Sequence, residues 1–191
     1  LRVVDYKTGN KAFNLDEVYC GLNTQMLLYL FTLRSNAAQV YKNPVAAGVL
    51  YLAGDPVLKT GSRAEAAAAP VYKVDGLVLN DELVDATGMF VPFAFGKDGA
   101  PRASAKLASL EKLGNIEKHL DALVVEMARG LYAGEIDAVP LRTAAHCPCD
   151  VCDYRPVCLH EDGRGETSVQ APKDVFETRA DACKAQGEGN I

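Results

Sequence analysis

Two residues near the start of the chain, Asp5 and Lys7, have the types and the spacing for metal-dependent chemistry on a phosphate. They end an apolar run that begins at Leu1 and predicts a β-strand. Side chains two residues apart on a strand point to the same face, so the carboxylate and the ammonium should lie side by side. A carboxylate can bind a divalent metal, and an ammonium can neutralise a reacting phosphate. The alternative is an ordinary surface ion pair at a strand end.

The next segment predicts a helix over residues 14–34, because it opens with a capping-box pattern and continues with helical spacing. One stripe of that helix should face a sheet: Val18, Leu22, Gln25, Tyr29 and Leu33. A buried amide costs about 1–3 kcal/mol unless it is hydrogen-bonded, so Gln25 needs a polar partner. Either Gln25 and Tyr29 reach a polar pocket beside Asp5 and Lys7, or they are a boundary Gln and an ordinary core Tyr.

Further elements follow from apolar patterns. Residues 44–53 form a continuous apolar run and predict a buried strand, which should pair in parallel with the first strand because a helix lies between them. Residues 71–79 fit either a strand or a turn. A short helix is expected over 81–86, and a hairpin near 91–104, where Phe90, Phe93 and Phe95 favour a small core over base stacking.

A long helix is expected from about Lys106 to Ala133, with a division at Gly114–Asn115 and an end at Gly134. Its apolar stripe comprises Leu113, Ile116, Leu120, Leu123, Met127 and Leu131. His119 lies near this stripe without a ligand partner in the sequence and is interpreted as structural or exposed.

Four of the six cysteines lie within residues 147–158: Cys147, Cys149, Cys152 and Cys158. A disulfide framework is typical of short secreted chains and is disfavoured here, because the chain is longer and shows no signal peptide. Zinc is a second interpretation, since His146 and His160 flank the cysteines. An iron–sulfur cluster is the third. Cys20 is expected to be a packed small residue, and Cys183 a free thiol.

The D-x-K triplet at Asp5 and Lys7, followed by Q-x-x-x-Y at Gln25 and Tyr29, resembles the RecB-type branch of the PD-(D/E)xK nuclease superfamily. The resemblance implies an α/β fold with a partial restriction-endonuclease-like core, and DNA hydrolysis that depends on Mg²⁺ or Mn²⁺. Asp5 would be a metal ligand, and Lys7 would polarise the phosphate or orient the attacking water. Gln25 and Tyr29 would position DNA or support the site.

The spacing Cys149-x2-Cys152-x5-Cys158 resembles the AddB family, the B subunits of bacterial AddAB ATP-dependent helicase–nucleases. The resemblance covers residue 1 to about residue 160. It implies a [4Fe-4S] cluster whose fourth ligand lies outside this chain or is Cys147, with zinc as the alternative metal. It also implies DNA as substrate, an AddA-like helicase–nuclease subunit as partner in a heterodimer, and the processing of double-strand breaks for recombinational repair.

This sequence also departs from the RecB-type pattern. Those nucleases carry a His and a further carboxylate upstream of D-x-K, whereas here the triplet begins at residue five. We therefore expect a C-terminal fragment of a longer protein that does not cut DNA alone. Its organisation should be the C-terminal part of a nuclease core over 1–104, a helix with the cysteine-cluster segment over 105–160, and a flexible tail over 161–191. A rival hypothesis is a non-catalytic module, stapled by iron–sulfur or zinc, that binds DNA or acts as a scaffold.

Composition and net charge narrow the class of protein to which this chain can belong. The 191 residues are 49% hydrophobic, which fits a globular chain, and the net charge of −5 argues against a general nucleic-acid coat protein. No apolar stretch is long enough for a transmembrane helix, so no membrane association is expected. A cysteine-rich motif without a secretion signal predicts a reducing cytoplasm.

Overall fold

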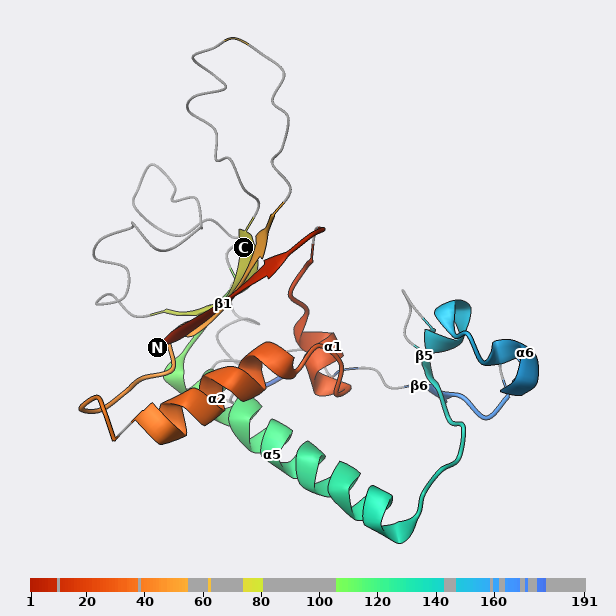
Figure 1. Ribbon diagram of the computed structural model, residues 1–191. Helices are drawn as coiled ribbons and strands as arrows, with labels where there is room; N and C mark the ends of the chain where they lie inside the picture. The colour runs from red at the N-terminus through yellow and green to blue at the C-terminus, as the bar shows by residue number, and fades with distance from the viewer. Residues whose placement is uncertain are drawn as a thin grey trace, which may run out of the picture.

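The computed structural model describes residues 1–9, 11–37, 39–54, 62, 74–80, 106–142, 147–158, 160–161, 164–168, 171 and 175–177. A four-stranded sheet has the order β1 (Arg2–Lys7), β2 (Gly48–Ala53), β3 (Val74–Leu79) and β4 (Leu107–Ala108). β1 is parallel to β2, β2 is antiparallel to β3, and β3 is parallel to β4 (Figure 1). The predicted parallel pairing of the first two strands is confirmed, and 74–79 is a strand.

Among the described residues, three helices accompany the sheet: α1 (Leu15–Tyr19), α2 (Gln25–Ala37) and α5 (Leu110–Ala133). They lie on one side of it, below the strands in the view of Figure 1. The core forms where inward-facing strand residues such as Val49 and Leu77 meet Leu27 and Leu30 of α2 and Ile116 of α5. These side chains are almost completely buried, so their burial is the main stabilising contribution to this layer. The α/β class expected from the sequence is confirmed.

The single helix predicted over residues 14–34 is wrong. Asn14 is the N-cap as expected, and its side chain accepts a hydrogen bond from the backbone of Asp16 at 2.9 Å. The helix then ends at Tyr19, because Gly21 and Asn23 adopt left-handed backbone conformations with φ of +82° and +54°. The chain restarts as α2 in a different rotational phase.

That change of phase overturns the predicted stripe. The residues of α2 that face the core are Met26, Leu27, Leu30 and Phe31. Val18 is buried as expected, whereas Leu22, Gln25, Tyr29 and Leu33 are exposed. A pattern of spacings three and four is continuous only while the helix is continuous, so the break invalidates the phase of every later residue.

α5 is one uninterrupted helix, so the predicted division at Gly114–Asn115 is wrong. It begins with Ser109 as N-cap rather than near Lys106, and it ends at Gly134, whose φ of +76° confirms the predicted stop. Its stripe packs in the first half, through residues such as Ile116. In the second half Leu131 is 78% exposed.

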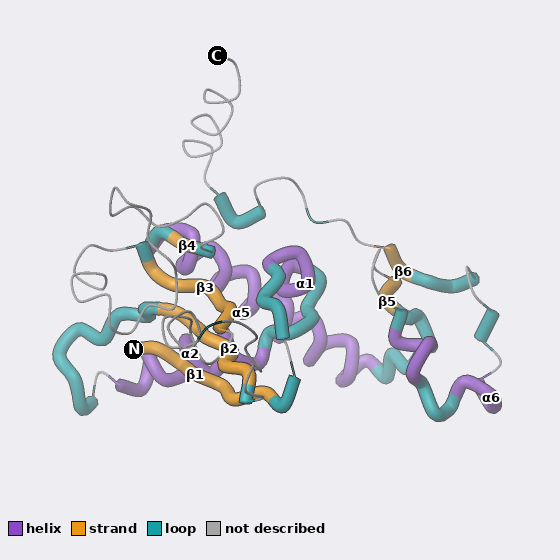
Figure 2. Tube along the Cα trace, turned by 90° about the horizontal axis from the view of Figure 1, so that it is seen from above, coloured by secondary structure: helices purple, strands orange, loops and turns teal. Residues whose placement is uncertain are grey.

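The described residues between 141 and 168 lie beyond the C-terminal end of α5, apart from the main sheet (Figures 1 and 2). They contain β5 (Leu141–Arg142), the 3-10 helix η1 (Pro148–Val151), α6 (Arg155–Cys158) and β6 (Thr167–Ser168), with β5 and β6 paired in parallel. Two parts of the segment predicted as a flexible tail therefore make defined contacts. β6 pairs with β5, and Phe176 packs against the core of the main sheet.

The short helix expected over 81–86 and the hairpin expected near 91–104, with Phe90, Phe93 and Phe95, lie outside the described residues. Among the helices that the structure describes, none is long and apolar enough to cross a membrane.

Candidate active site

Asp5 and Lys7 lie on one face of β1, as the two-residue period of a strand requires. The Lys7 Nζ atom is 2.6 Å from Asp5 Oδ2, and both side chains are partly exposed. The hydrogen bond to Asp5 raises the pKa of Lys7 above its ordinary value. The Lys7 ammonium therefore remains protonated throughout the neutral range, next to a carboxylate that can still use its second oxygen.

This face of β1 is the face that the helices cover. Asp5 pairs in register with Tyr51 of β2, and Tyr51 belongs to the core that packs against the helices. The Lys7 ammonium lies over the Tyr51 ring, 5.8 Å from its centroid. Burial raises the pKa of Tyr51, and the charges of Asp5 and Glu17 raise it further against the opposing effect of Lys7. The cation thus lies between a carboxylate and the face of a buried aromatic ring.

Gln25 and Tyr29 stand at the start of α2. β1 and β2 are parallel and α2 connects them, so α2 runs back along the sheet and begins at the end where β1 finishes with Lys7. Both side chains are exposed, and Gln25 Nε2 donates to the Tyr29 hydroxyl at 2.9 Å. The amide is satisfied by its own helix rather than by a buried pocket. That all four side chains act on one substrate stays a prediction.

Sequence reasoning missed three residues that the sheet brings to this region. Tyr51 was hidden within an apolar run. Asp75 of β3 pairs in register with Tyr51, so Asp5, Tyr51 and Asp75 form one row across three strands. Asp75 also forms an ion pair with Lys106 at 2.6 Å. A carboxylate two residues before the inward-facing Leu77, in an otherwise apolar strand, was the signal that could have identified it.

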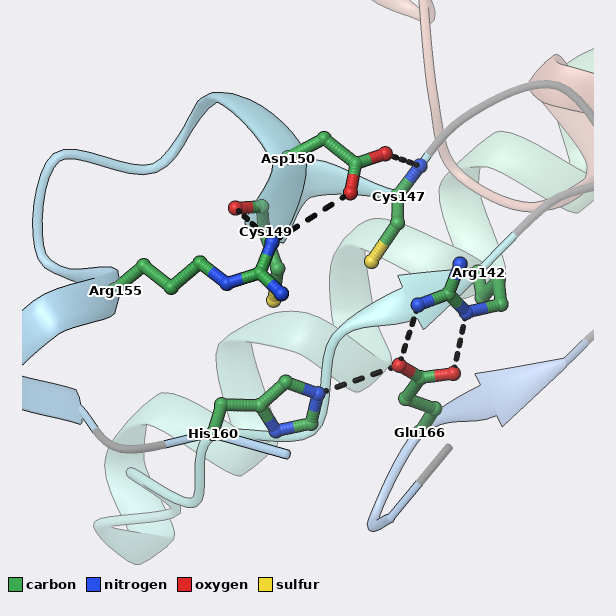
Figure 3. Close-up of polar contacts among 7 residues, drawn as sticks. All are labelled: Arg142, Cys147, Cys149, Asp150, Arg155, His160 and Glu166. Carbon is green, nitrogen blue, oxygen red and sulfur yellow. Dashed lines mark hydrogen bonds and ion pairs between the residues drawn. The ribbon is translucent and has the colours of Figure 1, made fainter. Parts of the chain in front are cut away.

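The cysteine-bearing segment forms a separate cluster of contacts (Figure 3). Cys147 is buried, Cys149 is half-buried, and Cys152 and Cys158 are exposed. Burial raises the pKa of the Cys149 thiol, and the neighbouring Cys147 and Cys152 raise it further. Cys147 and Cys152 therefore lie near the Cys149 thiol, and the choice between Cys147 and a residue outside this chain as fourth ligand stays a prediction. Cys158 lies at the end of α6.

Thiols are suitable donors for an iron–sulfur cluster or for zinc, but their arrangement here is incomplete as a metal site. No group of three His, Cys, Asp or Glu side chains in the described parts of the chain is arranged to hold a metal ion. Asp5 likewise belongs to no such group among the described residues, although its carboxylate is a suitable type of ligand for Mg²⁺. His146 lies outside the described residues, and His160 turns its Nε2 toward Glu166, at 3.3 Å.

A buried carboxylate closes the two ends of the cysteine-bearing segment. Glu166 lies between Arg142 and His160 (Figure 3). It accepts hydrogen bonds from Arg142 Nε at 2.5 Å and Nη2 at 2.8 Å. The Glu166 side chain is only 8% exposed and that of Arg142 is 39% exposed, so this two-point contact is partly shielded from water. The contact joins β5 before the cysteines to the residue preceding β6 after them.

These features can be compared with known proteins. Residues 1–159 match the family described as the PD-(D/E)XK nuclease superfamily. The match covers most of the chain, and the chain belongs to this superfamily. The motif resemblance at Asp5, Lys7, Gln25 and Tyr29 pointed to the same superfamily.

Several individual relatives are named as the B subunit of an ATP-dependent helicase/deoxyribonuclease. The relative from Desulforudis audaxviator (strain MP104C) is 34% identical over 176 residues, which is 84% of this chain and 15% of that protein. Those from Bacillus cereus and Thermoanaerobacter sp. (strain X514) are 30% and 29% identical, and cover 94% and 92% of this chain but 17% and 16% of the relatives. The chain spans about a sixth of the length of the curated relatives it matches. The resemblance to the AddB family is confirmed at this level.

Proposed function

We propose that this chain forms part of the nuclease in the B subunit of a helicase–nuclease, and that the full-length subunit hydrolyses DNA phosphodiesters. The observation that carries the proposal is the Asp5–Lys7 pair, held on the helix-covered face of β1 in a chain of this superfamily. The names of the relatives support DNA as the substrate and an ATP-driven helicase as the setting. If the Asp5–Lys7 ion pair lay at the surface without Tyr51 and Asp75 in the same row of the sheet, it would support only the non-catalytic alternative.

The chain's own residues have distinct parts in this proposal. Lys7 keeps its proton at neutral pH and presents a fixed positive charge to the non-bridging oxygens of the phosphate, whose negative charge grows in the transition state. Asp5 would be the ligand from this chain for Mg²⁺ or Mn²⁺, together with oxygen ligands outside the described residues. When bound, such an ion supplies Lewis-acid chemistry to the phosphate and its attacking water.

Gln25 and Tyr29 would contact the DNA rather than the reacting phosphorus. Their exposed hydrogen bond leaves the second amide hydrogen and the phenolic proton for the backbone or base edges of a strand that lies along the start of α2. We expect their loss to weaken DNA binding more than it slows the chemical step.

The cysteines would have a structural part. Cys149, Cys152 and Cys158 would bind a [4Fe-4S] cluster, with Cys147 or a residue outside this chain as fourth ligand, and zinc as the alternative. An AddA-like subunit would supply the unwinding that feeds single strands to this site, in the cytoplasm, at broken DNA ends. The closed segment held by Glu166 supports this proposal because it brings the cysteine-bearing chain back on itself through contacts of its own.

The test uses the full-length subunit in complex with its helicase partner. Lys7→Met should lower the rate of cleavage of linear DNA about 10²- to 10³-fold, because it removes a positioned charge. Lys112→Met is the matched control, since Lys112 also forms an ion pair, with Glu177, but on α5. Unchanged cleavage by the Lys7 variant would refute the catalytic assignment and leave the non-catalytic module as the better hypothesis.

A second measurement tests the cysteines. Cys152→Ser should release iron and abolish the visible absorbance of a cluster, whereas Cys20→Ser, which alters a thiol on the first helical segment, should retain both. Retention of full iron content by the Cys152 variant would contradict the cluster, and stoichiometric zinc in both proteins would favour the alternative metal.

A further inference from the structure

The carboxylate of Asp75 accepts hydrogen bonds from its own strand and from residues outside it. Oδ1 accepts hydrogen bonds from its neighbour Gly76 N at 2.8 Å and from Lys106 Nζ at 2.8 Å. Oδ2 accepts from Lys106 Nζ at 2.6 Å and from Phe13 N at 3.1 Å. Both oxygens are therefore fully used, by three different segments of the chain.

Lys106 completes the arrangement from the other side. Its Nζ atom also donates to the carbonyl oxygen of Phe13 at 2.7 Å. The single Asp75–Lys106 ion pair thus binds both the N–H and the C=O of one residue in the connection between β1 and α1. A residue held at both backbone groups has its position and its orientation fixed together.

Phe13 transmits this position to the candidate active site. Its side chain is buried, and its ring centroid is 6.4 Å from that of Tyr51. Tyr51 pairs in register with Asp5, and its ring lies beneath the Lys7 ammonium. The ion pair, the phenylalanine and the tyrosine therefore form a continuous packed path to Lys7.

We propose that Asp75 and Lys106 are positioning residues for the nuclease reaction: they hold Phe13 against Tyr51 and so fix the place of the Lys7 ammonium relative to the phosphate. This inference rests on the proposed function. Neither residue touches the reacting atoms. Replacing either residue should change the rate of the chemical step rather than DNA binding. A misplaced Lys7 charge stabilises the transition state less, while the binding surface stays intact.

The experiment uses the full-length subunit with its helicase partner and linear DNA. Asp75→Asn should lower kcat about 10- to 100-fold with KM for DNA changed by less than about twofold, because small displacements at a reacting centre are costly. The matched control is Glu117→Gln, which breaks the Arg34–Glu117 ion pair between α2 and α5, also partly exposed. That variant should keep kcat within about twofold of the unaltered protein.

Lys106→Gln provides an independent variant in case Asp75→Asn does not fold. It should reproduce the fall in kcat, and the double variant should be no slower than the slower single variant, because both changes remove one contact. Unaltered kcat in folded Asp75→Asn or Lys106→Gln protein would overturn the inference, as would an equal fall in the Glu117 control.

Lys7→Met in the same preparations separates this inference from the proposed function. If Lys7→Met is inactive and Asp75→Asn has full kcat, the positioning role alone is wrong. If Lys7→Met cleaves DNA normally, the proposed function is wrong, and any effect of Asp75→Asn concerns stability only.

Discussion

Gly21 forms the turn between α1 and α2, and its replacement by alanine tests what holds that turn. Its φ of +82° costs a residue with a side chain about 1–2 kcal/mol. An added Cβ would lie 3.0 Å from Leu123 Cδ2 and 3.3 Å from Met127 Cε. Both atoms end flexible side chains that can shift, at a further cost of about 0.5–1 kcal/mol for displaced rotamers. We expect Gly21→Ala to lower the free energy of unfolding by about 1.5–3 kcal/mol.

Gly114→Ala is the matched control. Gly114 lies inside α5, and a Cβ added there would have no atom within 4 Å. Alanine is favoured over glycine in a helix by about 0.5–1 kcal/mol, so this variant should be more stable than the unaltered protein. The same chemical change therefore has opposite signs at two positions, and the difference in unfolding free energy should be about 2–4 kcal/mol.

Urea unfolding followed by circular dichroism measures both variants under one set of conditions. On thermal unfolding, the Gly21 variant should lose about 3–12 °C in Tm, at about 2–4 °C per kcal/mol for a chain of this size. Equal shifts for the two variants, or a stabilised Gly21→Ala, would show that the turn does not depend on a left-handed residue. The account of the helix break would then be wrong.

Three further outcomes are expected. Ser109→Ala should cost about 1 kcal/mol in unfolding free energy, because it removes the side-chain cap of α5. Glu166→Gln should cost about 2 kcal/mol, because it weakens a two-point, charge-assisted contact made by a carboxylate that is only 8% exposed, and a smaller loss than that of Ser109→Ala would contradict this. The pKa of Lys7 is raised in the folded state, so the stability that its Asp5 contact contributes is fully present below the ordinary lysine value of 10.5 and is lost as pH rises through the higher folded value. Unfolding of the unaltered protein and of Lys7→Met, compared from neutral to strongly alkaline pH, should show a constant difference that disappears only above that ordinary value.

Local patterns predicted the elements that depend on short-range physics. The strand at residues 2–7, the Asn14 cap and the Gly134 stop follow from alternation and capping chemistry within a few residues. The ion pair of Asp5 and Lys7 follows from the period of a strand. These predictions needed no knowledge of distant contacts.

The errors arose where a tertiary contact or a single backbone conformation decides the outcome. The position of Gln25 depends on how far the chain turns at Gly21 and Asn23, which no apolar spacing encodes. Asp75 and Lys106 meet because β3 and the approach to β4 are neighbours, although 31 residues separate them. Cys147 is buried whereas Cys152 and Cys158 are exposed, a difference that the spacing of the cysteines does not encode.

The length of α5 sets both a distance and an angle between the strand that carries Lys7 and the segment that carries the cysteines. Its 24 residues rise about 36 Å, and its second half has little packing of its own. Deleting one residue there would shorten the separation by about 1.5 Å and rotate everything beyond it by about 100°. A partner or DNA strand that contacts both ends of α5 therefore restricts changes in its length to whole helical turns. The surface side chains of the helix can still vary.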